Sequence, residues 1–247
     1  MDKKTERKLI TKVRRNPTKL KEIQEQTENI CLAAVSVYGE TLKLVRHQTD
    51  KICIAAVKQT GWALHYVKDK TPEICLEAVK QNGNALKFIE EQTPEICLEA
   101  VKQNGYALKY VKEQTHEICL EAVKSHGQAL EYAKIQDDEI CSVAVKEDGF
   151  ALKFVKNKSE NTCIAAINNK IEAAIYLNFK DRNSCLAAAK LYINEEDKNK
   201  NKILTKIINN FSKDNEFIDL YTKYRLWNYV EKFKNDTIKY SMLWKST

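Results

Sequence analysis

Cysteine recurs at intervals of 22 residues along this chain of 247 residues. The six glycines follow the same interval, and alanine occupies the third position after every cysteine. The two columns are Cys31, Cys53, Cys75, Cys97, Cys119, Cys141, Cys163 and Cys185, and Gly39, Gly61, Gly83, Gly105, Gly127 and Gly149. Two uncommon residue types on one strict period indicate a tandem array, because a globular core without repeats has no reason to space them so regularly. We therefore predict a repeat protein.

The period weakens toward both ends of the sequence, which suggests a domain organisation. Residues 1–24 are predicted to form a basic cap with a degenerate repeat, and residues 25–194 the array itself. Residues 195–202 read as a polar linker, and residues 203–247, which hold nine of the 21 aromatic residues, as an aromatic helical cap. Atypical outer units are expected, because each has a neighbour on only one side.

A single repeat, taken from Thr93 to Gln114, has the marks of two helices. Thr93 is a suitable N-cap and Pro94 a suitable first helical residue. Gly105 is expected to end this helix in a left-handed conformation. Ala107, Leu108 and Val111 then have the spacing of a second, shorter helix rather than the alternation of a strand, which disfavours the rival helix-and-strand horseshoe. The predicted fold is an all-α solenoid of 22-residue helix–turn–short-helix repeats with capping helices at both ends.

The cysteine column is expected to be structural. Stacked helices lie roughly 8–10 Å apart, beyond the Cα separation of about 7 Å that a disulfide tolerates. No CxxC pair or Cys/His cluster is present, so neither a metal nor a cofactor is expected. The thiols then serve as small buried hydrophobic groups, which favours a reducing compartment, the cytoplasm or alternatively the nucleus. The sequence shows neither a secretory signal nor a long apolar stretch, so we expect no contact with a membrane.

The repeated phrase T-P-E-I-C-x-x-A-V-K-x-x-G-x-A-L-x-x-V resembles the domain-of-unknown-function 4116 repeat family over residues 26 to about 179. This family is best known from large DNA viruses and also occurs in some microbes. The resemblance implies a helical repeat protein, with a viral origin as one possibility and the host cytoplasm as its place in that case. It carries no catalytic residue over to this chain. The layout is also similar to leucine-rich variant repeats, but the clustered cysteines that accompany an iron–sulfur site in some of those proteins are missing.

The net charge of +7 is concentrated in the first residues of the chain. Residues 1–21 carry nine Lys or Arg against Asp2 and Glu6, whereas residues 22–194 sum to about −3. The candidate basic surface consists of Lys3, Lys4, Arg7, Lys8, Lys12, Arg14 and Arg15. This leader would suit phosphate groups or an acidic partner, or would simply be a solvated cap. The lysine columns within the array, one of which begins at Lys58, lie beside glutamates and are interpreted as a salt-bridged wall.

The residue after each glycine varies from repeat to repeat, so it is a candidate for partner choice. Aromatic residues alternate there with polar ones; the candidate partner-binding residues are Trp62, Asn84, Tyr106, Gln128 and Phe150. Four positions later stands a second aromatic column, and i,i+4 pairs such as Trp62 with Tyr66 are expected along one helix face. The rings would then be either binding anchors or wedges that complete the core. A reader of single-stranded RNA would also use such residues, but the carboxylate columns argue against it.

No catalytic constellation is apparent in the sequence. The four histidines occupy different columns, and no glycine-rich phosphate loop, GxSxG or HExxH motif occurs. We therefore expect a non-enzymatic scaffold that mediates protein–protein interaction inside the cell, with no metal and no membrane. The alternative is nucleic-acid binding, to RNA or DNA, through the basic leader and the lysine columns.

Overall fold

The computed structural model describes residues 1–177, and every regular element within them is a helix. The chain divides into two compact units, unit 1 (Met1–Ile135) and unit 2, which begins at Gln136. Cys185, the predicted linker (195–202) and the predicted cap (203–247) lie outside the described residues.

Each repeat consists of an α-helix followed by a 3-10 helix. Unit 1 contains α1 (Lys3–Arg15), η1 (Pro17–Glu22), α2 (Glu28–Val35), η2 (Gly39–Leu44), α3 (Asp50–Gln59), η3 (Gly61–Tyr66), α4 (Pro72–Gln81), η4 (Gly83–Phe88), α5 (Pro94–Gln103), η5 (Gly105–Tyr110), α6 (His116–Ser125) and η6 (Gly127–Tyr132). Unit 2 contains α7 (Asp138–Glu147), η7 (Gly149–Phe154), α8 (Glu160–Asn169) and η8 (Ile171–Tyr176).

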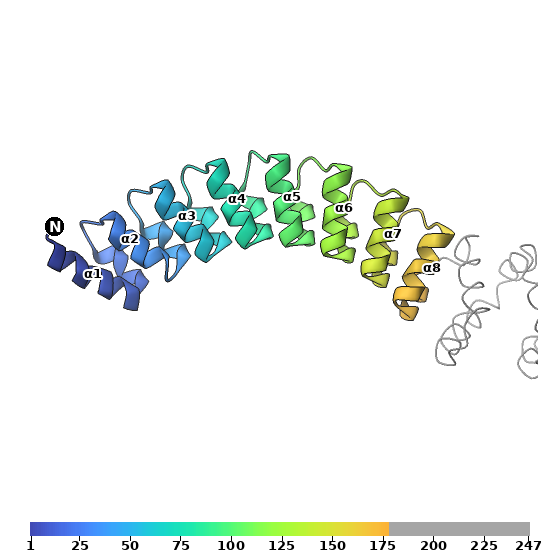
Figure 1. Ribbon diagram of the computed structural model, residues 1–247, viewed down its shortest axis with the longest axis horizontal. Coiled ribbons are helices and arrows are strands. Elements are labelled where there is room, and N and C mark those ends of the chain that lie inside the picture. The colour runs from blue at the N-terminus through green and yellow to red at the C-terminus, as the bar shows by residue number, and fades with distance from the viewer. Residues whose placement is uncertain (178–247) are drawn as a thin grey trace, which may run out of the picture. The chain divides into compact units, whose positions relative to one another are not determined.

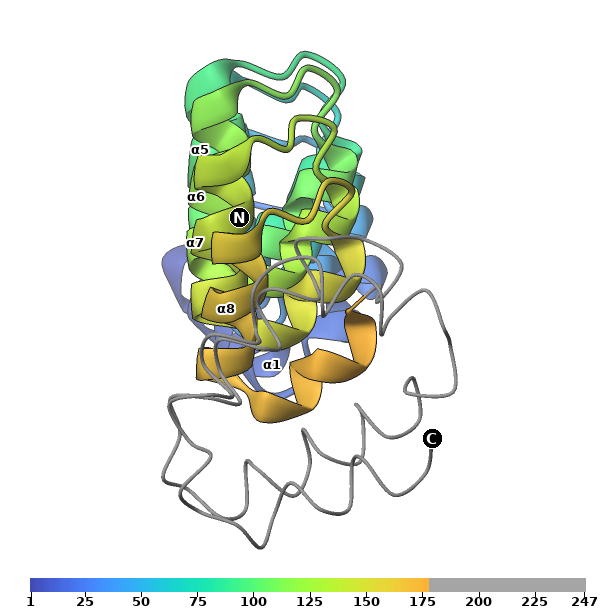
Figure 2. The ribbon, with the colours of Figure 1, turned by 90° about the vertical axis from the view of Figure 1, so that its right-hand side faces the viewer.

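Consecutive repeats within each unit stack side by side, as the row α1 to α6 of unit 1 shows (Figure 1). Within each unit the α-helices lie on one side and the 3-10 helices on the other (Figure 2). This arrangement confirms the predicted all-α solenoid of 22-residue repeats.

The threonine before each of the helices α2 to α6 acts as the predicted N-cap. The Thr93 hydroxyl accepts a hydrogen bond from the backbone N–H of Ile96 at 3.3 Å, and Pro94 is the first residue of α5. The acidic side chain of Glu95 lies in the same first turn, where the helix dipole favours negative charge. The helix starts were therefore readable from the residues that begin each repeat.

The second helix of each repeat is a 3-10 helix of six residues. In η5 the N–H of Ala107 donates to the carbonyl of Asn104 at 2.8 Å, and that of Val111 donates to Leu108 at 3.1 Å. These i→i+3 bonds give about three residues per turn, so positions four apart no longer share a face. The side chains of Ala107 and Leu108 are fully buried, as their apolar character predicts.

The glycine column has a different role from the one predicted. Gly105 begins η5 rather than ending α5, which terminates at Gln103 with Asn104 extended, and its φ lies outside the left-handed region. The glycines are required instead because the next repeat comes so close. A Cβ built on Gly61 would lie 2.6 Å from the carbonyl oxygen of Ala78, well inside van der Waals contact. The prediction of a left-handed glycine was wrong, and close backbone approach replaces it.

The glycine N–H also donates a hydrogen bond to the following repeat. In what we call the glycine contact, the acceptor is a side chain 20 residues later at the end of the next α-helix. The contacts in unit 1 are Gly39 to Gln59 Oε1 (2.7 Å), Gly61 to Gln81 Oε1 (2.5 Å), Gly83 to Gln103 Oε1 (2.6 Å) and Gly105 to Ser125 Oγ (3.2 Å). In unit 2, Gly149 donates to Asn169 Oδ1 at 2.8 Å.

A second polar link, the glutamine bridge, joins the repeats on their other side. The Gln48 side chain donates from Nε2 to the carbonyl of Tyr66 at 2.9 Å and accepts at Oε1 from the N–H of Lys68 at 3.0 Å. The same pair of bonds recurs at Gln26, Gln92, Gln114 and Gln136. One amide thus satisfies two backbone groups of the next repeat, which would otherwise be left unpaired where the chain turns.

The cysteines occupy the core side of the α-helices. All seven described cysteines are buried and none of them forms a disulfide, as predicted. The thiol of Cys97 points toward the Oε1 atom of the bridging Gln92, at 3.6 Å. Burial raises the pKa of this thiol, and together with nearby aspartates it raises the pKa of Cys53 and of Cys141 to about 11. These thiols therefore stay protonated at neutral pH, which makes them poor nucleophiles.

Candidate interaction surface

The alternating aromatic residues all lie at the second position of a 3-10 helix. Trp62 in η3 is the most open, with 37% of its surface exposed, and Tyr106 in η5 is half-buried. Phe150 holds the same position in η7 of unit 2 and is also half-buried. These rings are therefore neither core residues nor free surface side chains, and each presents part of its surface to solvent.

Each of these rings packs against an aromatic ring of the next repeat, 26 residues later. The centroid distances and interplanar angles are 5.8 Å and 77° for Trp62–Phe88, 6.5 Å and 76° for Tyr106–Tyr132, and 6.3 Å and 89° for Phe150–Tyr176. These edge-to-face geometries are favourable. The rings therefore pair with a ring of the next repeat and not, as expected, with the residue four positions later in the same helix. Residues i and i+4 of a 3-10 helix do not lie on the same face. We call the three pairs the aromatic ladder.

The polar residues between the ladder pairs are half-buried. The N–H of Asn84 donates to the Oδ1 atom of Asn82 at 3.0 Å, which fixes the start of η4. The Oδ1 atom of Asn84 itself is buried and has no hydrogen-bond partner. Gln128 holds the same position in η6 and is also half-buried. The structure therefore places both candidates beside the rings, without showing what either would bind.

A column of basic residues that was not predicted from the sequence lies over the aromatic rings. Its members in unit 1 are Lys43, His65, Lys87 and Lys109, all of them exposed. Lys87 Nζ lies 4.3 Å from the ring centroid of Trp62 and 4.6 Å from that of Phe88. Lys109 Nζ lies 4.8 Å from the centroid of Tyr110. In the sequence these residues recur every 22 positions, each directly before a residue of the second aromatic column. Glu131 interrupts this basic pattern.

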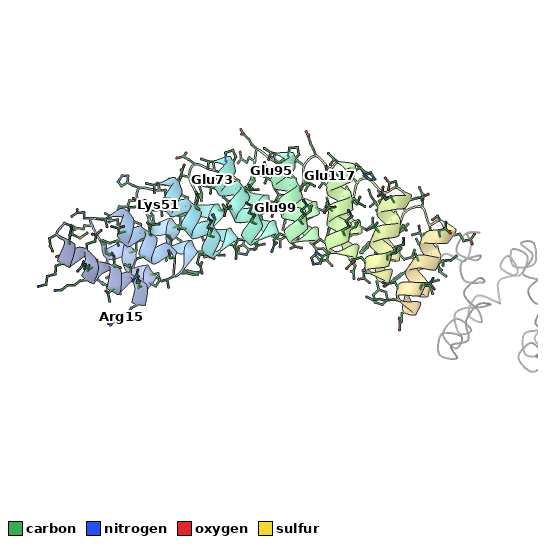
Figure 3. The ribbon with its side chains drawn as sticks, in the orientation of Figure 1. Arg15, Lys51, Glu73, Glu95, Glu99 and Glu117 are labelled. Carbon is green, nitrogen blue, oxygen red and sulfur yellow. The ribbon has the colours of Figure 1, made fainter. Side chains whose placement is uncertain are left out.

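Carboxylates and lysines share the row of α-helices. Glu73, Glu95 and Glu117 lie at the edge where α4, α5 and α6 begin (Figure 3). Further along, Lys58 pairs with Glu77 of the next helix at 3.3 Å. Lys80 pairs with the same carboxylate at 3.2 Å, and Lys124 with Glu121 at 2.7 Å. This wall agrees with the predicted salt-bridged interpretation, and the charges also suit the dipoles of helices that begin at the same edge.

A second basic column, which in unit 1 consists of Arg46, Lys68, Lys112 and Lys134, binds the backbone of its own chain. Lys68 Nζ donates to the carbonyl of Arg46 at 3.3 Å, and Lys134 Nζ donates to that of Lys112 at 3.1 Å. Lys112 Nζ makes the equivalent bond to the carbonyl of Glu90 at 2.6 Å. These ammonium groups therefore support the connections between repeats, which reduces the charge they can offer to a ligand.

The candidate basic leader forms most of α1. All seven of its proposed residues are exposed: Lys3, Lys4, Arg7, Lys8, Lys12, Arg14 and Arg15. Only Val13 of this helix is buried. Lys12 pairs with Glu22 at 3.2 Å, and the Asp2 side chain caps the helix by accepting from the N–H groups of Lys4 and Thr5. The leader is thus an ordered helix that carries its charge on the surface.

Residues 1–177 contain no group of three or more His, Cys, Asp or Glu side chains placed to hold a metal ion. None of the helices in this part of the chain is both long enough and apolar enough to cross a membrane.

The family described as domain of unknown function DUF4116 matches the chain four times, at residues 49–93, 71–115, 93–136 and 115–158. Successive matches start 22 residues apart, which is the structural repeat. No curated protein and no solved structure matches the chain.

Proposed function

We propose that this chain, whose residues 49–158 are DUF4116 repeats, is a non-enzymatic scaffold that binds a protein partner through the 3-10 helices of each unit. The observation that carries the proposal is the aromatic ladder. Its pairs recur every second repeat, beginning at Trp62, Tyr106 and Phe150, and the rings remain partly open to solvent.

The energetics of the two rows favour the ladder as the binding surface. Half-exposed aromatic rings are the groups most enriched at interface hot spots, because they bury a large area at a small cost in conformational entropy. A partner that covers Trp62 and Lys87 would also desolvate their cation–π contact and so strengthen it. On the α row, by contrast, pairs such as Lys58–Glu77 are satisfied within the chain.

Inside the cell, the cytoplasm or the nucleus is the proposed location, because buried cysteines that form no disulfide suit a reducing compartment. The resemblance to repeats best known from large DNA viruses makes a viral or host protein the first partner to look for. The proposed scaffold needs no cofactor or metal.

The experiment is a quantitative pull-down from cell lysate with the wild-type chain and a triple variant, Trp62→Ala, Tyr106→Ala and Phe150→Ala. Glu73→Gln, Glu95→Gln and Glu117→Gln form the matched control, since they change three repeats on the opposite row (Figure 3). We expect a discrete set of proteins that survives nuclease treatment, is lost with the ladder variant and persists with the control. Circular dichroism must show that all three chains are folded.

Nucleic-acid binding is the second candidate, and the exposed basic side chains of α1 favour it. Its signature is a steep logarithmic loss of affinity with salt, because bound phosphates release counterions. A partner set that disappears with nuclease, or that the ladder variant retains in full, would contradict the scaffold proposal and direct attention to α1.

A further inference from the structure

Two polar links that join the α3 repeat to the α4 repeat are replaced between the α1 and α2 repeats. Between α3 and α4, Lys58 Nζ pairs with the Glu77 carboxylate at 3.3 Å. The same two repeats are also joined by the glycine contact, from Gly61 of η3 to Gln81 of α4. The equivalent positions in the first two repeats lie 44 residues, or two repeats, earlier in the sequence: residues 14 and 33 for the ion pair, and residues 17 and 37 for the glycine contact.

At those positions the chain has residues that cannot make either link. Arg14 stands where Lys58 does, but Ala33 stands where Glu77 supplies the carboxylate. Pro17 replaces the glycine and has no N–H to donate, and Val37 replaces the glutamine that would accept it. Arg14 makes no ion pair within the described residues. Its guanidinium group therefore lacks the carboxylate that its counterpart in α3 has.

These replacements leave an open hollow of about 440 Å³ between α1 and α2. Its apolar part is formed by half-buried Ile10 and Leu32, by Ala33, and by Val37, which is 46% exposed. Arg14 completes the lining together with Asn29 and Ser36. A guanidinium beside an apolar hollow suits a ligand that carries a carboxylate next to an apolar side chain.

Positive charge extends from this hollow along α1. Lys3, Arg7, Ile10 and Arg14 are spaced four, three and four, so they follow one face of the helix. Lys3 and Arg7 also line a neighbouring open hollow with Lys4, Lys8 and Thr11. The nearby carboxylate of Glu6 is occupied, since it accepts hydrogen bonds from Thr27 Oγ1 at 2.6 Å and from Asn29 Nδ2 at 3.2 Å.

We propose that the α1–α2 surface binds an acidic amphipathic segment of a partner protein. One apolar side chain enters the hollow over Leu32 and Val37, and a carboxylate pairs with Arg14 in place of the absent glutamate. Further carboxylates face Arg7 and Lys3. The apolar lining favours a peptide over nucleic acid, because burying it is favourable against an apolar side chain and not against a phosphate backbone. This site is separate from the aromatic ladder and does not depend on it.

The test uses the full chain and a library of random 16-residue peptides, from which binders are selected and then measured by fluorescence anisotropy. The decisive variant is Ala33→Glu, which installs the carboxylate found at Glu77 and so neutralises Arg14 from within the chain. The matched control is Ala165→Glu, the same change in the same column of α8. Val37→Gln restores the polar residue of the interior repeats at an exposed position. Thermal melting confirms that each variant is folded.

We expect the selected peptides to combine Asp or Glu with Leu, Ile or Phe. Their affinity should fall about tenfold or more with Ala33→Glu, the effect of losing one charged hydrogen-bonded pair. It should fall severalfold with Val37→Gln and stay unchanged with Ala165→Glu and with Trp62→Ala. A library that yields no such peptide, or peptides that Ala33→Glu leaves unaffected, overturns the proposal.

Two further outcomes also overturn it and identify the occupant instead. A 20-nucleotide oligothymidylate that outcompetes the peptides, with a steep salt dependence, would assign α1 to nucleic acid. A dimer in sedimentation that Ala33→Glu dissociates would assign the surface to a second copy of this chain.

Discussion

Substitutions at Gly61 can distinguish between two reasons for a glycine at this position. One reason is the close approach of the next repeat, and the other is a left-handed backbone conformation. At Gly61 a Cβ would lie 2.6 Å from the Ala78 carbonyl oxygen and 2.9 Å from the Asn82 Cβ. Replacing this glycine must therefore push two repeats apart. The Gly61 N–H, which donates to Gln81 Oε1 at 2.5 Å, would lose its partner in the process.

The cost can be worked out from these two effects. Overpacking typically destabilises by about 1–3 kcal/mol, and an unsatisfied buried N–H costs about 1–3 kcal/mol. The lower entropy of the unfolded chain returns about 0.4–1 kcal/mol when alanine replaces glycine. Gly61→Ala should therefore lower the free energy of unfolding by about 1–6 kcal/mol, measured by urea denaturation with far-ultraviolet circular dichroism.

Gly61→Asn provides the internal comparison. Asparagine tolerates the left-handed region better than alanine does, so it would be the milder change if a positive φ were the reason for glycine. If close approach is the reason, the larger asparagine must destabilise at least as much as alanine. An asparagine variant clearly more stable than the alanine variant would refute the reasoning.

Three further predictions concern the links between repeats. Gln114→Ala should cost about 2–3 kcal/mol in urea denaturation, because it removes both bonds of a glutamine bridge, whereas Glu113→Ala at the exposed neighbouring position should stay within about 0.5 kcal/mol. The pKa of Cys53 is raised from 9.0 to about 11 in the folded state. The contribution of the protonated thiol to the free energy of unfolding is therefore fully present below pH 9 and is lost as the pH rises toward 11. Melting temperatures at pH 8 and pH 10 should show this fall, and Cys53→Ala should lessen it; equal slopes would contradict it. Asn84→Phe should increase the free energy of unfolding by about 0.5–1.5 kcal/mol and so raise the melting temperature. The substitution removes a buried oxygen without a hydrogen-bond partner, and the new ring can pack on Tyr110 as Tyr106 packs on Tyr132. A lower melting temperature would mean that the Asn84 oxygen has a partner after all.

The features of the fold that depend on residue type alone were predictable from the sequence. A 22-residue period in cysteine and glycine implies stacked units, and Thr93 before Pro94 marks where a helix begins. Burial of Cys97 follows because a small apolar side chain suits the place where helices approach. Each of these properties belongs to one residue and its immediate neighbours, so the sequence expresses it directly.

The features that depend on contact between repeats were not predictable in the same way. The glutamine bridge joins Gln48 to backbone groups 18 and 20 residues later, and backbone groups leave no mark in a sequence. Glycine at position 61 is compatible with either a positive φ or a close approach, and only the neighbouring carbonyl decides between them. Likewise, Trp62 contacts Phe88 rather than Tyr66 because the short helix is a 3-10 helix, a distinction that apolar spacing over six residues cannot make.

The constant offsets of the polar links also bear on how such an array can change in length during evolution. Each glycine contact described above has its acceptor 20 residues later, and each glutamine bridge has its carbonyl 18 residues later. A duplication of 22 codons among the repeats that make these links would therefore supply each new donor with an acceptor at the same offset. The near identity of Lys70–Gly83 and Gln92–Gly105 is what such a duplication leaves behind. Gain or loss of whole repeats would preserve every interface, whereas an insertion of any other length would break both kinds of link where it occurs.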